Sequence, residues 1–156
     1  MKEKEFSISY KILSENELSE EQKKTMEAAT NAVKTAYSPY SNYQVGAALF
    51  LENGEVVAGN NQENAVYPLG LCAERVALFN SGTLYPTVKP LLLALTVASE
   101  NKPGFPCGSC RQALIEFELR FECEISILIE SRNNEYIYFD SVKEILPFAF
   151  DQSNLD

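Results

Sequence analysis

The sequence predicts an α/β sandwich in which helices pack on the faces of one mixed sheet. The chain has 156 residues, the length of one ordinary domain. Patterns typical of helices and strands follow one another along it, without an internal repeat, a low-complexity segment or a linker. The run 91–97 is apolar apart from Thr96, as expected of a strand buried on both faces. We therefore expect a single domain over 1–156.

The first part of the chain predicts an extension followed by a helix. Residues 6–13 alternate apolar and polar side chains, which is typical of a half-buried edge strand. The N-terminal extension, residues 1–17, is thus expected to contain such a strand. Ser19 and Gln22 then form a capping-box pattern that opens a helix with one apolar face. This helix should end before Pro39, which cannot continue it.

A β-hairpin is predicted next. Residues 45–51 read as a strand of small and apolar side chains, and residues 56–58 read as its partner. Asn53 and Gly54 lie between them, and this dipeptide favours a type I′ turn with positive φ at both positions.

Helices and strands alternate over the rest of the chain. The predicted elements are an ordered loop at 59–70, helices at 72–80 and 108–119, strands at 91–98, 123–130 and 135–139, and a capping box at 141–144 that opens a last short helix.

Composition narrows the classes of function. The net charge of −9 argues against a nucleic-acid partner, because binding to phosphates needs a field of Lys and Arg. No run approaches the ~20 apolar residues of a membrane span, and the charged N-terminus has no signal-peptide pattern. A cytoplasmic location is therefore expected. The chain has no histidine, which excludes Ser-His-Asp and Cys-His catalysis.

The first motif whose side chains could bind a metal or take part in a reaction is Cys107-Gly-Ser-Cys110, preceded by Pro106. Two thiolates with this spacing at the start of a helix can bind one cation. The positive end of the helix lowers the pKa of both thiols. On its own, this motif also fits a redox pair or two buried thiols.

The second motif, Cys72-Ala-Glu-Arg, opens another predicted helix. With it the chain offers three thiolates, and a catalytic zinc site keeps three protein ligands and one open position. Glu74 would lie beside the metal without binding it, where a carboxylate can take a proton from water. Arg75 can donate hydrogen bonds to the thiolates and offset their negative charge. Together the two motifs form the all-cysteine version of the zinc nucleobase deaminase signature.

The sequence closely resembles the small cytidine deaminases. The segments that carry the resemblance are 38–48, 61–65, 71–78, 106–117 and 145–150. The resemblance implies a three-layer α/β/α sandwich with a mixed five-stranded sheet. It also implies zinc-dependent hydrolytic deamination of cytidine and 2′-deoxycytidine to uridine and 2′-deoxyuridine, with release of ammonia. The expected assembly is a homotetramer with its sites at subunit interfaces.

Five residues match the metal centre of that family. The resemblance implies that Cys72, Cys107 and Cys110 bind one Zn²⁺ per chain. Glu74 matches the catalytic residue that moves protons. Arg75 matches an arginine that hydrogen-bonds the ligand thiolates.

Five further residues match the family's substrate-binding positions. Asn61 and Glu63 match the pair that binds the ribose hydroxyls, and the backbone of Ala73 matches a donor near the pyrimidine oxygen. Tyr43 stands where the family usually has Phe beside the nucleoside. Phe150 matches an aromatic residue supplied by a neighbouring subunit. From residue type alone, the loop residues among these could equally be solvated side chains.

Two other interpretations remain open at this point. The substrate could be another cytosine nucleoside, such as a blasticidin-type antibiotic. Cys123 could instead complete a closed four-thiolate zinc site, which would make the protein a structural module. That interpretation leaves Glu74 unexplained. Cys123 also begins a predicted strand, where a small apolar thiol suits a core.

Overall fold

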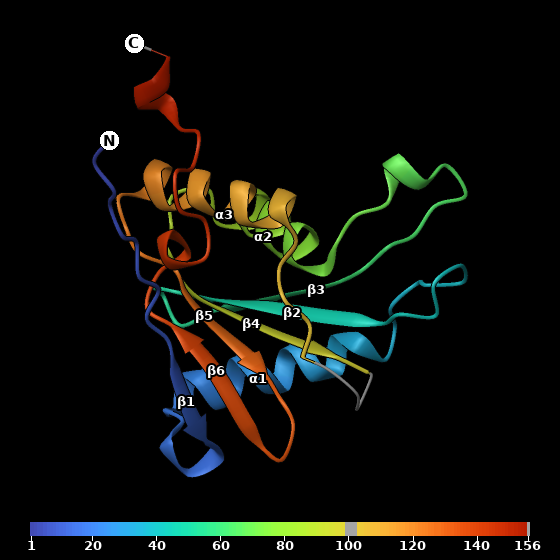
Figure 1. Ribbon diagram of the computed structural model, residues 1–156. Helices are drawn as coiled ribbons and strands as arrows, with labels where there is room; N and C mark the ends of the chain where they lie inside the picture. Colours follow the sequence, from blue (N-terminus) through green and yellow to red (C-terminus); the bar gives the residue numbers. More distant parts are fainter. Residues whose placement is uncertain (99–102, 156) are drawn as a thin grey trace.

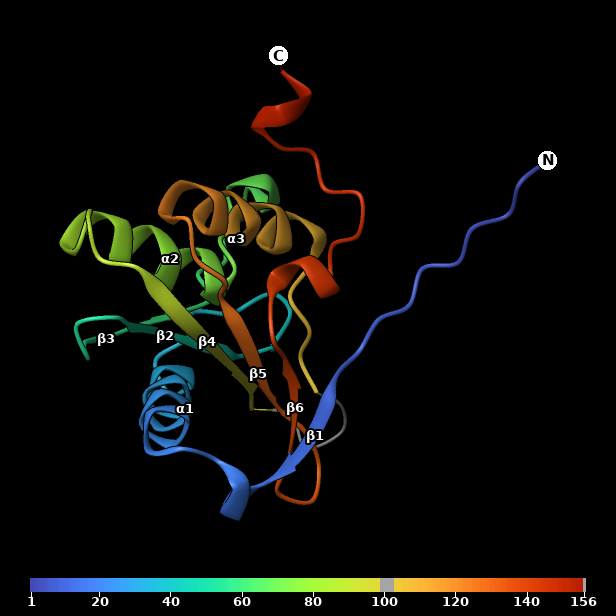
Figure 2. The ribbon, with the colours of Figure 1, turned by 90° about the vertical axis from the view of Figure 1, so that its left-hand side faces the viewer.

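A mixed sheet lies between two layers of helices (Figures 1 and 2). This computed structural model describes residues 1–98 and 103–155, so residues 99–102 and 156 of the predicted domain lie outside the described part. Helix α1, Glu20–Val33, covers one face of the sheet. Helices α2, Ala73–Leu84, and α3, Gly108–Phe121, cover the other. The three-layer α/β/α sandwich is thereby confirmed.

Over the described residues, the sheet has six strands in the order β1-β6-β5-β4-β2-β3. Among these strands only β4 and β5 are parallel, and the other neighbours run antiparallel. The expected five strands were one too few, because β1 of the N-terminal extension adds a sixth at the edge beside β6. The strands are β1 Lys11–Ser14, β2 Val45–Leu51, β3 Val56–Asn60, β4 Pro90–Val97, β5 Ser126–Glu130 and β6 Glu135–Phe139.

The edge strand β1 is shorter than the alternating pattern at 6–13 predicted, and it begins further along the chain. Lys11 pairs with Tyr138, one residue before the end of β6 at Phe139. Residues 1–9 therefore lie beyond the end of β6, and Figure 2 shows the N-terminal segment leaving the domain. The length of the partner strand, which alternation does not encode, sets the boundary.

The capping box that opens α1 is confirmed. The Ser19 side chain accepts a hydrogen bond from the Gln22 backbone, and the Gln22 side chain accepts one from the Ser19 backbone. The helix ends at Val33, before Pro39, as expected. Among the described residues, no helix is both long and apolar enough to cross a bilayer.

The β2–β3 hairpin is confirmed, but its predicted type I′ turn is wrong. Gly54 has φ +84°, whereas Asn53 has no positive φ. The Gly54 N–H donates to the Leu51 carbonyl at 2.8 Å. This geometry is a type I turn followed by a left-handed glycine. Two consecutive positive φ values occur instead at Asn133 and Asn134, between β5 and β6.

Several later boundaries also differ from the predicted ones. Helix α2 continues beyond residue 80 to Leu84, while Cys72 is its N-cap rather than its first turn. The strand predicted at 123–130 begins only at Ser126, because Glu122 caps α3 in a left-handed conformation. At 141–144 the Ser141 side chain does cap a short 3₁₀ helix. The capping box there is incomplete, because Glu144 accepts from Asp140 instead of Ser141.

Successive side chains of a strand point to opposite faces of the sheet, so each face has its own hydrophobic core. In β2, Leu49 and Leu51 face α2 and α3, while Ala48 faces α1. The same split occurs in β4, where Leu93 and Leu95 belong to the first core. The sheet thus holds α2 and α3, with Cys72 and Cys107 at their N-termini, on one face.

Gly59 of β3 sets how closely α2 approaches the sheet. A Cβ at this position would lie 2.5 Å from the Ala77 nitrogen and 2.9 Å from the Ala73 carbonyl oxygen. Both are backbone atoms, so only a shift of α2 would relieve the contact. We expect Gly59→Ala to lower the free energy of unfolding by about 1–3 kcal/mol, measured by urea denaturation.

Gly108→Ala is the matched control, because an added Cβ there meets no described atom within 4 Å. A glycine replaced without strain stabilises by about 0.4–1 kcal/mol. Equal stability of Gly59→Ala and the wild type would contradict the close approach of α2.

Candidate active site

Three cysteines converge where the N-termini of α2 and α3 meet. Cys72 is the N-cap of α2, Cys107 is the N-cap of α3, and Cys110 lies in the first turn of α3. The Sγ atoms of Cys72 and Cys107 are 3.9 Å apart, and those of Cys107 and Cys110 are 3.5 Å apart. All three sulfurs lie within 4.8 Å of one another, close enough to bind one metal ion.

The surroundings of the cluster favour negative charge on the sulfur of Cys72. Nη2 of Arg75 donates to the Cys72 sulfur at 3.8 Å. The pKa of the Cys72 thiol is lowered to about 5, because Cys110 and then Arg75 hydrogen-bond its sulfur. The pKa of Cys110 is raised by its hydrogen bond with Cys72 and by burial. Two helix N-termini add positive potential at the same place.

The donor set suits zinc. Three sulfurs from two helix starts match the soft ligands of zinc sites, and three ligands leave one position open. Cys123 is not part of the group, because its Sγ donates instead to the Pro90 carbonyl at 3.3 Å. The closed four-thiolate module is therefore not formed.

Glu74 lies in the first turn of α2, beside the cysteines. Its side chain is almost fully buried, at 4% exposure, and it lines the same pocket as Cys72 and Cys107. Burial raises the pKa of the Glu74 carboxyl to about 7. A carboxyl group with this pKa can both accept and release protons near neutral pH.

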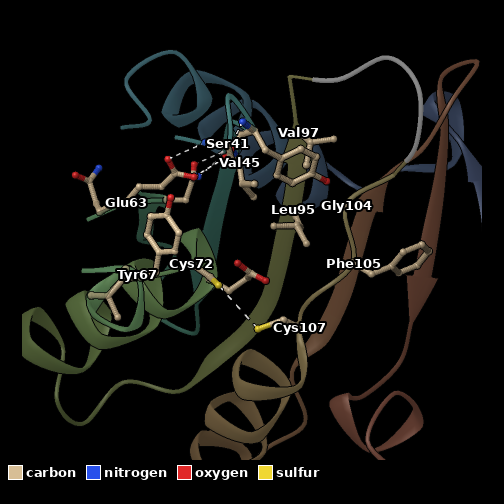
Figure 3. Close-up of a pocket in the computed structure, with 16 residues that line it drawn as sticks. Ser41, Val45, Glu63, Tyr67, Cys72, Leu95, Val97, Gly104, Phe105 and Cys107 are labelled. Atoms are coloured by element: carbon tan, nitrogen blue, oxygen red, sulfur yellow. Dashed lines mark hydrogen bonds between the residues drawn. The ribbon is translucent and has the colours of Figure 1, made fainter. Parts of the chain in front are cut away.

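The pocket in front of the cluster has a volume of about 550 Å³, within the range of small-molecule sites. Its apolar wall includes Val45 at the start of β2, and Leu95 and Val97 at the end of β4. Val45 and Val97 are register partners, so the pocket lies at this end of the sheet. Figure 3 shows the sulfurs of Cys72 and Cys107 facing each other at one end, with Glu63 hydrogen-bonded to Ser41 at the other.

Asn61 and Glu63 both line this pocket and also hold the loop over residues 40–45. Asn61 accepts from the Val45 N–H at 2.9 Å and donates to the Tyr43 carbonyl at 2.8 Å. Glu63 accepts from the Ser41 hydroxyl and, at 2.9 Å, from the Tyr40 N–H. The Ser41 hydrogen bond lowers the pKa of Glu63. Each side chain keeps hydrogen-bonding capacity for a ligand.

The other predicted substrate-binding residues differ in their placement. Tyr43 lines the pocket, and burial raises the pKa of its hydroxyl. Ala73 is fully buried as the first residue of α2, where backbone N–H groups lack partners within the helix. Phe150 is 60% exposed and is not among the described residues that line the pocket of its own chain.

Ser41 is a pocket residue that the sequence did not reveal. Besides donating to Glu63, its Oγ accepts from the Tyr43 N–H at 3.0 Å. It lay within the segment that resembles a known family, but a single serine in a loop carries no sign of a partner more than twenty residues away.

The chain matches a family described as "Cytidine and deoxycytidylate deaminase zinc-binding region" over residues 19–122. Among curated proteins, it is 37% identical to the cytidine deaminase of Halalkalibacterium halodurans, covering 82% of this chain and 92% of that protein. It is 35% identical to the cytidine deaminase of Sporosarcina psychrophila, covering 85% and 93%.

Solved structures agree with these relatives. The cytidine deaminase of Burkholderia pseudomallei superposes with a TM-score of 0.73 at 35% identity, covering 82% of this chain and 98% of that one. The cytidine deaminase of Mycobacterium tuberculosis gives a TM-score of 0.67 at 32% identity, covering 83% of this chain and 96% of that one. Fold, cysteine cluster and sequence agree, and the chain belongs to the cytidine and deoxycytidylate deaminase family of zinc-binding enzymes.

Proposed function

We propose that the protein deaminates cytidine and 2′-deoxycytidine by zinc-dependent hydrolysis, giving uridine, 2′-deoxyuridine and ammonia in pyrimidine salvage. One observation carries the proposal: three thiols converge, and two of them, Cys72 and Cys107, line a pocket of nucleoside size together with a buried carboxyl group. The relatives named as cytidine deaminases support the choice of substrate.

Cys72, Cys107 and Cys110 would hold the zinc ion. When bound, zinc supplies the Lewis acidity that makes water a nucleophile at neutral pH. Arg75 offsets the charge of the three thiolates through its hydrogen bond to Cys72. The two helix N-termini act in the same direction.

Glu74 is the proposed proton carrier. Hydrolysis adds water at C4 of the ring and expels the amino group, so one proton must reach N3 and another must reach the departing nitrogen. Glu74 takes one proton of the water to N3. It then takes the second from the new hydroxyl on C4 and delivers it to the amine, so the C4–N bond breaks, ammonia leaves and C4 becomes a carbonyl. Its burial beside the cluster keeps this transfer away from bulk solvent.

The remaining pocket residues orient the nucleoside. Asn61 and Glu63 bind the ribose hydroxyls with the hydrogen-bonding capacity left by their loop contacts. The Ala73 N–H donates to the pyrimidine oxygen, and the Tyr43 ring lies beside the base. Because Asn61 also fixes the backbone at Tyr43, it couples the sugar-binding and base-binding sides of the pocket.

The pocket should prefer a nucleoside to its 5′-phosphate. Glu63 and Glu74 line it, and none of its described lining residues is Lys or Arg. Electrostatic repulsion of a phosphate group by about 1.4 kcal/mol is enough to lower kcat/KM tenfold. We expect kcat/KM for cytidine to exceed that for cytidine 5′-monophosphate by at least about tenfold, measured by ultraviolet absorbance. Equal values would contradict this substrate class.

We propose a homotetramer with its sites at subunit interfaces. The exposure of Phe150 supports this, because the ring lies outside the pocket of its own chain and is free to enter that of a neighbour. A cytoplasmic location is proposed as well, because a reducing compartment keeps the three thiols of the cluster available for zinc.

A further inference from the structure

Two neighbouring side chains of α3 hold both ends of the C-terminal segment, defined here as residues 145–150. Nη1 of Arg111 donates to the Ile145 carbonyl at 2.8 Å. Nε2 of Gln112 donates to the Phe150 carbonyl at 2.7 Å. Both contacts are to main-chain oxygens, so they fix the path of the backbone and leave the ring of Phe150 free.

Arg111 also connects this segment to the cysteine cluster. Its Nε donates to the Pro106 carbonyl at 2.8 Å, and Pro106 directly precedes Cys107. One rigid guanidinium therefore bridges the peptide before a cluster cysteine and the start of the C-terminal segment. A lysine has a single nitrogen and cannot reproduce this fork.

Between the two anchors, the segment turns its aromatic side chains outward. Phe148 adopts a left-handed backbone, with φ +58°, and its side chain is 95% exposed. A non-glycine residue keeps this conformation only where its surroundings impose it. Leu146 and Ala149 pack against the core in the same stretch, while Phe150 stays exposed. The anchors thus hold the segment in place with its rings directed away from the domain.

We propose that Arg111 and Gln112 are positioning residues for the deamination, because they hold the C-terminal segment against the start of α3 and so fix where Phe150 presents its ring. This inference rests on the proposed function, in which Phe150 of one copy closes the pocket of a neighbouring copy. Neither side chain touches the substrate, so each acts through the segment that it holds.

The first test is Gln112→Leu, which removes the donor at similar size. Losing one hydrogen bond that orders the segment is expected to raise KM for cytidine about two- to tenfold. The kcat, the zinc content and the melting temperature should stay near the wild type. Arg111→Lys should raise KM in the same direction. Glu116→Gln, at an exposed position of the same helix, is the control and should change nothing.

A double-mutant cycle with Phe150→Ala separates positioning from general stability. Phe150→Ala should raise KM by itself, and Gln112→Leu should then add no further increase, because no ring remains to be placed. Independent, multiplying effects would overturn the positioning role and leave the proposed function intact. An unchanged KM in Phe150→Ala would overturn the role of that ring and this inference with it. Absence of cytidine deamination in the wild type would refute the proposed function itself.

Discussion

Replacing Glu74 by Gln is expected to lower kcat for cytidine by about 10²–10⁴-fold, the usual contribution of a general acid–base group. The amide has the same shape as the carboxyl group, but it cannot take a proton from water and release it to the ring. At 4% exposure the position admits little bulk water that could replace it. Zinc content should stay at the wild-type level, because Glu74 is not one of the three cluster cysteines.

Glu118→Gln is a matched control for that variant. Glu118 is also buried, at 2% exposure, but it accepts hydrogen bonds from the Ile125 and Val142 N–H groups, away from the cysteine cluster. Its replacement should lower the melting temperature and leave kcat of the folded enzyme unchanged. A wild-type kcat in Glu74→Gln, measured under the same conditions, would remove Glu74 from the chemistry.

Cys110→Ala is expected to abolish zinc binding and activity together. Cys110 is fully buried and supplies one of three sulfurs, so no described side chain in the cluster can replace it. Loss of a residue that only hydrogen-bonds a metal ligand typically costs about 10–100-fold in metal affinity or activity, so loss of a ligand itself should cost more than about 100-fold. Zinc per chain, measured by elemental analysis, and absorbance at the cytidine band report the two effects.

Cys123→Ala gives the contrasting result. Its thiol donates to the Pro90 carbonyl and takes no part in the cluster, so zinc content and kcat should match the wild type. Zinc loss in Cys123→Ala, or full zinc retention in Cys110→Ala, would contradict the assignment of ligands.

The parts of the site that could be predicted are those encoded within a few residues. Cys107 and Cys110 belong together because their spacing and a helix start bring both sulfurs to one point. The Cys72 and Glu74 pair follows from the same logic in α2. The convergence of the two helix starts followed from the resemblance to a known family, and the structure brings the sulfurs together.

The parts that could not be predicted depend on partners far apart in the sequence. Arg111 donates a hydrogen bond to the Ile145 carbonyl, and Ser41 donates one to Glu63. Tertiary folding brings these residues together, and no local sequence pattern specifies it. The edge strand shows the same limit, because alternation marked residues 6–13 whereas the length of β6 selected Lys11–Ser14. The site to which the Phe150 ring contributes stays a prediction, since it involves a second copy.

X-ray absorption at the zinc edge of the purified protein tests the central claim most directly, because it counts the sulfur atoms bound to the metal. We predict three sulfur ligands per zinc, from Cys72, Cys107 and Cys110, with one coordination position left open for the reaction. Four sulfur ligands would contradict the account, since a closed thiolate site would leave Glu74 with nothing to act upon.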